Sequence, residues 1–154
     1  MKSNQKRHIE LLKRSEDLKN QGKDIFTENK EEYFELAGYN VAVEEYFFWQ
    51  DRDQFALLLK NFLNKKIDGE FLCDEVFGMR RKLMIKCDKF KLELLSNSEK
   101  IQDFQPDERS KDFGGFLSRI YFNCDYFMED YQNEKFYDSV KNNFLDFQKA
   151  LDEE

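Results

Sequence analysis

The chain has 154 residues, of which 40% are hydrophobic and 37% charged, with 25 Lys or Arg against 32 Asp or Glu. This length suits one compact domain that buries its own core, and the composition excludes a disordered chain. The net charge of −7 argues against general nucleic-acid binding. No apolar run reaches the length of a membrane span, and the charged start MKSNQKRHIELLKR lacks a signal-peptide core. We therefore expect an intracellular protein with no direct contact to membrane or nucleic acid.

The three cysteines, Cys73, Cys87 and Cys124, lie at helical core positions and not in paired spacings. This indicates buried, reduced thiols in a reducing compartment. Phe and Lys are frequent and Pro is rare, which fits an AT-rich coding sequence, so a bacterial cytoplasm is expected, with a plastid stroma as the alternative. Because His8 is the single histidine, neither a histidine-containing zinc site nor a Glu-x-x-His di-iron site is expected. We predict no metal and no cofactor.

In chain order, residues 1–28 form a polar, basic segment with a modest helical pattern that stops near Gly22, and residues 29–154 form the predicted bundle domain. Asn29, with Glu32 three residues later, has the spacing of a helix start, and Gly38 is a candidate helix end. The segment YNVAVEEYFFWQ at 39–50 fits a strand or a helix, and its alanine and glutamates favour a helix.

The central stretch, 51–95, predicts two helices joined by the turn KKIDG. The first helix carries an apolar stripe of Phe55, Leu58, Leu59, Phe62 and Leu63. Asp51 and Gln54 resemble a capping box at its start, and Asp68 is the predicted N-cap of the second helix. The second helix has a seam in steps of three and four, made of Cys73, Val76, Arg80, Leu83, Cys87, Phe90 and Leu94.

Arg80 is the charged member of that seam, and it has two interpretations. Its stem could cover the core while the guanidinium reaches solvent or a carboxylate, or it could be a buried, paired arginine that sets the helix register. No base or nucleophile is arranged around it, so a catalytic role is not predicted.

A polar loop with the single proline, Pro106, follows this pair of helices. Gly114 and Gly115 are placed to let the next helix start close to another backbone. Two amphipathic helices are then predicted, at 115–131 and 133–151. The sequence therefore predicts an all-α, single-domain antiparallel bundle of about five or six helices.

Charge is uneven along the chain. Residues 1–30 hold eight basic against five acidic residues, residues 31–100 eleven against fourteen, and residues 101–154 six against thirteen, which gives +3, −3 and −7. The acidic last third is either a solvated surface or a face for a cationic protein. Carboxylates spaced i, i+4, such as Asp125 and Glu129, occur on any helix surface, and nothing marks them as catalytic. We predict a non-enzymatic protein.

The run NFLNKKIDGEFLCDEVFGMRRK resembles the opening helix pair of bacterial colicin-type immunity proteins, which include the colicin D immunity protein. The residues that carry the resemblance are Phe62, Leu63, Ile67, Gly69, Phe71, Phe77 and Arg80. The later order is also similar, with Pro106 and Asp107 in a polar loop before an aromatic, acidic helix, so the resemblance covers about residues 51–151. It implies a small helical protein that binds a tRNA-cleaving nuclease domain and blocks its site.

We accordingly predict an acidic helical protein that binds and inhibits a partner with a basic surface, such as a nuclease toxin. The alternative is a structural or adaptor helical module, including an organelle-encoded one. Charge and position in the loop and the following helix select the candidate contact residues, which are Asp103, Asp107, Glu108, Asp125, Glu129 and Asp130.

Overall fold

The structure, a computed structural model, describes residues 4–96, 107–130 and 133–152, and it leaves out the side chains of 128–130, 133 and 150–152. Its elements are α1 (Gln5–Asn20), α2 (Ile25–Glu28), α3 (Lys30–Gln50), α4 (Arg52–Leu63), α5 (Gly69–Ser96), α6 (Ser110–Asp130) and α7 (Asn133–Asp152). The prediction of an all-α fold is confirmed. The described residues form seven helices, slightly more than the five or six predicted, because α2 is a separate single turn.

Asn and Asp side chains start the first three helices. Asn4 accepts the Arg7 N–H, Asp24 accepts the Phe26 N–H, and Asn29 accepts the N–H groups of both Glu31 and Glu32. Each bond satisfies a backbone donor that has no partner inside its helix. The predicted start at Asn29 is therefore confirmed.

The expected helix end at Gly38 is wrong, because α3 continues from Lys30 to Gln50. Leu36, Tyr39 and Val43 are buried on one side of this helix, and Tyr39 stacks on the ring of His8 in α1 at 5.1 Å between centroids. Packing on both sides of Gly38 outweighs the weak helix preference of one glycine. The segment 39–50 is thus helical, as favoured.

The two central helices form as predicted, but only one of their expected caps does. Asp68 accepts the Phe71 N–H at 2.8 Å and caps α5. Asp51 makes no capping bond at α4, and its carboxylate instead accepts a bond from Lys86 of α5 at 2.7 Å. Helix α6 starts at Ser110, five residues before the expected Gly115.

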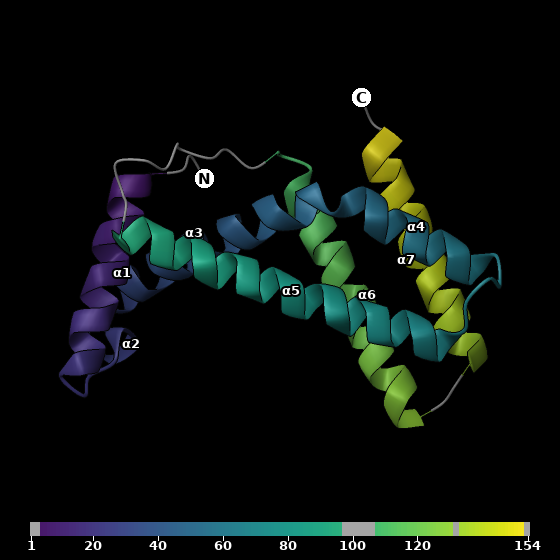
Figure 1. The fold of residues 1–154 in the computed structure, drawn as a ribbon, viewed down its shortest axis with the longest axis horizontal. Coiled ribbons are helices and arrows are strands. Elements are labelled where there is room, and N and C mark those ends of the chain that lie inside the picture. Colours follow the sequence, from purple (N-terminus) through teal and green to yellow (C-terminus); the bar gives the residue numbers. More distant parts are fainter. Residues whose placement is uncertain (1–3, 97–106, 131–132, 153–154) are drawn as a thin grey trace.

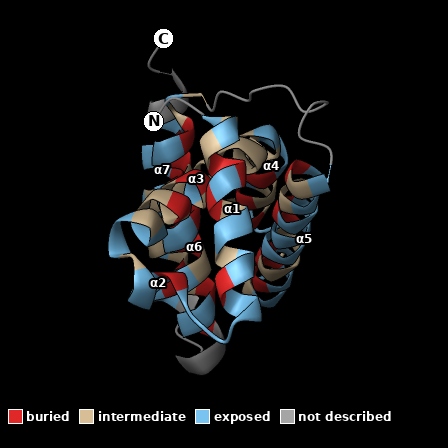
Figure 2. Ribbon diagram, turned by 90° about the vertical axis from the view of Figure 1, so that its left-hand side faces the viewer, coloured by how far each residue is buried: buried red, intermediate tan, exposed pale blue. Residues whose placement is uncertain are grey.

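Figure 1 shows how the long helix α5 spans the molecule. Helices α1 and α2 lie at one end, α4 and α7 at the other, and α5 crosses α6. Buried residues line the inward faces of these helices (Figure 2). The larger core lies among α4, α6, α7 and the first half of α5, and a smaller core joins α1, α2 and the first half of α3. Val43, Leu83 and Cys87 form a third cluster between α3 and α5.

The seam of α5 behaves as its pattern indicated. Arg80 is exposed, which rules out the buried, paired arginine of the second interpretation, and its guanidinium lies over the Tyr121 ring at 4.3 Å, a contact that neither interpretation included. Cys73, Cys87 and Cys124 are free and buried, and burial raises the pKa of Cys87 to about 11.

Within the described ranges, no helix combines the length and apolar composition that a membrane span needs.

Candidate protein-binding site

The first described acidic candidate is Asp107, just before α6, and its carboxylate binds Arg109 of the same chain. Both of its carboxylate oxygens accept bonds from the Arg109 guanidinium at 3.1 Å, and Oδ1 also accepts the Arg109 N–H at 2.9 Å. The side-chain bond from Arg109 is the main reason why the pKa of Asp107 is lowered. Arg109 in turn lies over the Trp49 ring at 5.0 Å. Asp107 therefore helps to hold the start of α6 against α3.

Of the other candidates, Glu108 precedes α6, and Asp125, Glu129 and Asp130 lie in its second half. Glu108 and Asp125 are exposed. Asp103 lies outside the described residues, and Glu129 and Asp130 lie in the last turn of α6 with side chains outside the description. A rise of 1.5 Å per residue separates Ser110 from Asp125 by roughly 22 Å along the helix axis. The structure thus places the described candidates at opposite ends of α6 and not in one cluster.

Asp125 lies in the part of α6 that contacts the start of α5, and the start of α5 also carries exposed acidic residues. The start of α5 lies against the end of α6, since Cys73 Sγ is 3.8 Å from the Cys124 carbonyl oxygen. A Cβ atom added to Gly69 would lie 2.8 Å from the Phe127 ring. Glu70 and Asp74 flank these contacts on α5, as Asp125 does on α6, and all three carboxylates are exposed.

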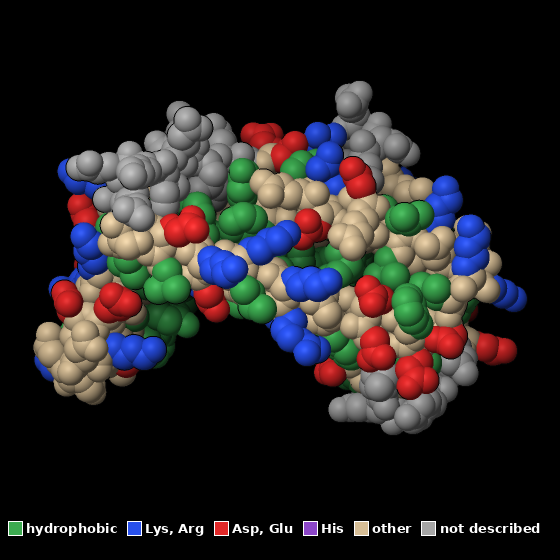
Figure 3. All heavy atoms as spheres, viewed as in Figure 1, with side chains coloured by type: hydrophobic (Ala, Val, Ile, Leu, Met, Phe, Trp, Pro, Cys, Tyr) green, Lys and Arg blue, Asp and Glu red, His purple; other side chains and the backbone are tan. Residues whose placement is uncertain are grey.

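We call Glu70, Asp74 and Asp125 the acidic corner. In Figure 3, acidic side chains gather at the lower right, over the start of α5 and the last turns of α6, while basic side chains follow the middle of α5. The spacing of Glu70 and Asp74 by four residues was visible in the sequence. The contact between the start of α5 and the end of α6, where Asp125 lies, was not visible, because it depends on where α5 crosses α6.

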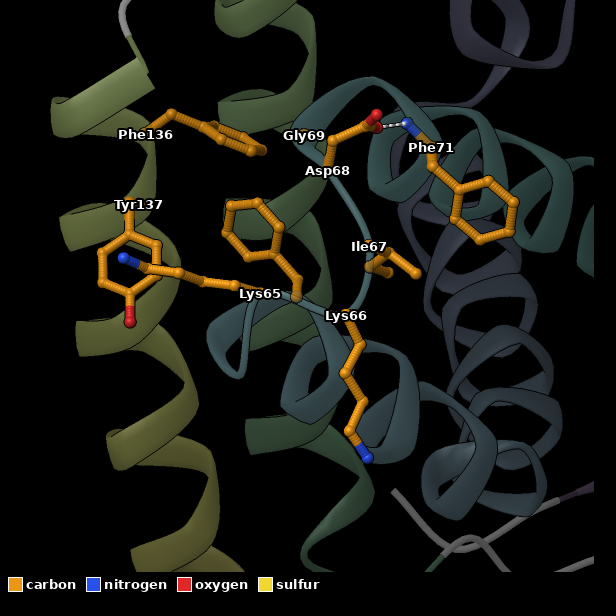
Figure 4. A pocket seen from close by; sticks show the side chains of 9 residues that line it. Lys65, Lys66, Ile67, Asp68, Gly69, Phe71, Phe136 and Tyr137 are labelled. Carbon is orange, nitrogen blue, oxygen red and sulfur yellow. Dashed lines mark hydrogen bonds between the residues drawn. The ribbon is translucent and has the colours of Figure 1, made fainter.

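An open pocket of about 590 Å³ lies beside this corner, at the turn between α4 and α5 and the start of α7 (Figure 4). The residues lining it are Phe62, Lys65, Lys66, Ile67, Asp68, Gly69, Phe71, Phe136 and Tyr137. Its wall is aromatic, with the Phe62 ring 5.4 Å from Phe136 and 5.7 Å from Tyr137. The Tyr137 hydroxyl donates to the Leu63 carbonyl at 3.0 Å, which ties α7 to the end of α4.

The turn that carries Lys65 and Lys66 holds an unusual backbone conformation. The Lys65 N–H donates to Phe62 O and the Lys66 N–H to Asn61 O, which is the pattern of a Schellman helix end. Lys65 has φ of 56°, a left-handed conformation that glycine adopts at lower cost, as Gly22 does at the end of α1 with φ of 71°. Figure 4 shows Lys65 extended toward α7 and Lys66 pointing the other way. Both lysines give the pocket a basic rim.

The chemistry of this region is that of a binding surface with both signs of charge. Lys65, Lys66, Asp68 and the half-exposed ring of Phe71 line an aromatic pocket, and the acidic residue Glu70 lies between two lining residues in the sequence. Such a surface can hold charged groups and an apolar side chain of another molecule together. Among the residues whose side chains are described, no three His, Cys, Asp or Glu groups are placed to hold a metal ion.

No family model, curated protein or solved structure matches this chain.

Proposed function

We propose that this protein binds another protein at the acidic corner and inhibits it by covering a basic functional surface. The observation that carries the proposal is that Glu70 and Asp74 of α5 and Asp125 of α6 are all exposed, and that each stands next in sequence to a residue through which the two helices contact. A surface with three exposed carboxylates attracts a cationic partner, which makes binding of such a partner favourable.

The surroundings of the corner supply the apolar part of such an interface. Phe71 lies between Glu70 and Asp74 and is 50% exposed, so its ring is available to a partner. Exposed aromatic side chains often carry much of the binding energy of an interface, and charge complementarity speeds encounter in a salt-dependent way. A nuclease that grips RNA phosphates needs a basic cleft, so an immunity-like role of the kind that the resemblance implies fits this surface.

The test is capture of a partner from the protein's native cell extract at low salt, followed by elution with rising salt and assay of ribonuclease activity. The bait is either the unchanged protein or a triple variant, Glu70→Lys, Asp74→Lys and Asp125→Lys. We expect the unchanged protein to retain a basic protein whose ribonuclease activity appears only after salt releases it. The triple variant should retain none of it.

A control variant tests whether charge reversal elsewhere on the surface has the same effect as charge reversal at this corner. Glu16 and Asp17 of α1 are exposed, so their replacement by lysine reverses charge on a distant helix without touching α5 or α6. The control variant should capture the partner as the unchanged protein does. Equal capture by the triple variant, or a captured protein that salt does not release, would contradict inhibition through the acidic corner.

An adaptor or structural role is the second candidate, and a different observation favours it. The rings of Phe26, Tyr33 and Phe34 form an exposed cluster at the junction of α2 and α3, with centroids 5.1 to 6.4 Å apart. Exposed rings that touch one another mark a surface for apolar contact. A partner held there would resist salt and would be indifferent to the charge of the acidic corner.

A further inference from the structure

Helix α3 carries a stripe of residues whose two halves have different surroundings. At 100° per residue, Lys30, Phe34, Val41 and Glu45 fall within an arc of about 60° on one side of the helix. The C-terminal continuation of this side packs on the start of α6, where Phe48 and Trp49 contact the Phe113 ring. Among the described residues, no helix covers Phe34 and Val41 in this way, since Phe34 is 63% and Val41 49% exposed.

The exposed apolar surface of α3 continues onto the neighbouring helical turn α2. The Phe26 ring of α2 lies 6.4 Å from Phe34, and Lys30 lies over the Phe26 ring at 5.3 Å. The small residues Ala37 and Gly38 lie between Phe34 and Val41 along the helix and are half-buried. A helix packed along this line would continue the contact that α6 already makes with the other half of α3.

We propose that the N-terminal half of α3 binds the same helix of a second copy of this chain, with the two helices antiparallel. The order of the residues along the stripe makes it complementary to itself. In the register that places Phe34 against Val41 of the second copy, Lys30 lies opposite Glu45 of that copy. The twofold axis repeats both contacts, so each ion pair and each apolar contact occurs twice.

The charges favour a second copy over an unrelated helix. Lys30 and Glu45 have opposite sign at the two ends of the stripe, about 22 Å apart, so an antiparallel copy meets opposite charge at both ends, whereas a parallel copy meets like charge. Burial raises the pKa of Glu45, and the attraction of Lys111 partly offsets this. A lysine from the second copy would further favour the charged carboxylate.

The proposal does not depend on the acidic corner, which uses residues of α5 and α6. Its test is analytical ultracentrifugation of the full chain over a range of concentrations. We expect a monomer–dimer equilibrium that Phe34→Glu or Val41→Glu abolishes. Leu57→Glu on α4 is the matched control. Leu57 is an exposed apolar side chain like Phe34 and Val41, but it lies outside the stripe. This control should dimerise as the unchanged protein does.

Charge exchange tests the register. Lys30→Glu alone and Glu45→Lys alone each place like charges opposite one another twice, and each should weaken dimerisation about tenfold. Mixing the two single variants restores both ion pairs across a mixed dimer and should restore the affinity. Circular dichroism of each variant checks that α3 still folds, since Glu45 lies close to Gly114 of α6.

Cysteine crosslinking tests the orientation and remains informative if Glu45→Lys unfolds the helix. A mixture of Phe34→Cys and Val41→Cys should form a mixed disulfide, whereas Phe34→Cys alone should form little. A protein that is monomeric at every concentration overturns the proposal. Preferential linkage between two copies of residue 34 would replace the antiparallel arrangement with a parallel one.

Discussion

The two ends of the molecule are stabilised in different ways. Among the described residues, the end built from α4, α6, α7 and the start of α5 has a core of sixteen buried residues, with edge-to-face and stacked rings around Phe113 and Phe116. The core that joins α1, α2 and the start of α3 has five buried hydrophobic residues in the same part of the chain that the structure describes. There, polar contacts supplement burial, including Arg7 with Glu35, Arg14 with Glu32, and His8 with Asn40.

This difference sets how each end should respond to perturbation. Burial of apolar surface is the larger stabilising contribution and is insensitive to salt, whereas exposed ion pairs contribute little and are screened. Elements with few buried contacts open locally at lower free energy than the main core. We therefore expect α1 to separate from α3 and α5 before the aromatic core unfolds.

The largest effect is expected for Phe113→Ala. Phe113 is 2% exposed and contacts the rings of Phe48, Trp49, Phe55 and Phe147. Removing its ring leaves a cavity and should lower the free energy of unfolding by roughly 3–5 kcal/mol, as measured by urea denaturation. Because this core holds most of the protein together, hydrogen exchange should become faster in α4 to α7 as well. A loss confined to α6 would argue against a shared core.

The smaller core is tested by Leu11→Ala. Leu11 of α1 is fully buried, and its truncation should cost about 2–4 kcal/mol of local stability. Hydrogen exchange should then accelerate in α1 and in the first half of α3, while α6 and α7 keep their protection. Equal loss of protection across all helices would show that the two ends unfold as one unit.

Two glycines in α5 allow a comparison between a position packed closely against the larger core and a position with open space around it. A methyl group on Gly69 would lie 2.8 Å from the Phe127 ring, whereas one on Gly78 would meet nothing within 4 Å. Gly69→Ala should therefore destabilise the protein by about 1–3 kcal/mol through overpacking. Gly78→Ala should stabilise it by about 0.5–1 kcal/mol through helix propensity, with both values taken from thermal melts. Changes of the same sign in both variants would contradict the close contact at Gly69.

The smallest effect is a dependence on pH at the N-terminal end. Burial lowers the pKa of His8 below its ordinary value of 6.5, Lys91 of α5 lowers it further, and the bond with Asn40 opposes both. The unfolded chain therefore binds a proton at higher pH than the folded chain does. Stability from neutral His8 is fully present above about pH 6.5 and declines as the pH falls below it.

Hydrogen exchange of α1 at pH 7.5 and pH 5.5, corrected for the intrinsic rate, measures this decline. His8→Gln removes the titrating group and should remove most of the difference between the two values. A difference that persists in this variant would contradict the assignment of the pH dependence to His8.

The helices were predictable because each has a local cause. Asn29 and Asp68 cap helices in the structure as their spacing indicated. The seam of α5 buries Cys73, Val76 and Leu83, as a pattern of threes and fours requires. The errors occurred where packing overrides local preference, since α3 passes through Gly38 and Asp51 bonds to Lys86 instead of capping α4.

The candidate site was less predictable than the helices. Charge along the chain pointed to Asp107 and Asp125 alike, yet Arg109 holds Asp107 while Asp125 stays exposed. Nothing in the sequence indicated that the helix segment with Asp125 contacts the segment with Glu70 and Asp74, because these residues are about fifty positions earlier. Only the crossing of α5 over α6 places the start of α5, with Glu70 and Asp74, against the end of α6.

The sequence by itself determined the all-α class, the buried thiols and most helix limits, because apolar period and capping residues act within a few turns of chain. The tertiary structure decided the division into two cores, the acidic corner with its aromatic pocket, and the exposed half of α3. Those features depend on which helix faces which other helix. Side-chain shape at the crossings sets that choice, through contacts such as Gly69 with Phe127 and Phe48 with Phe113.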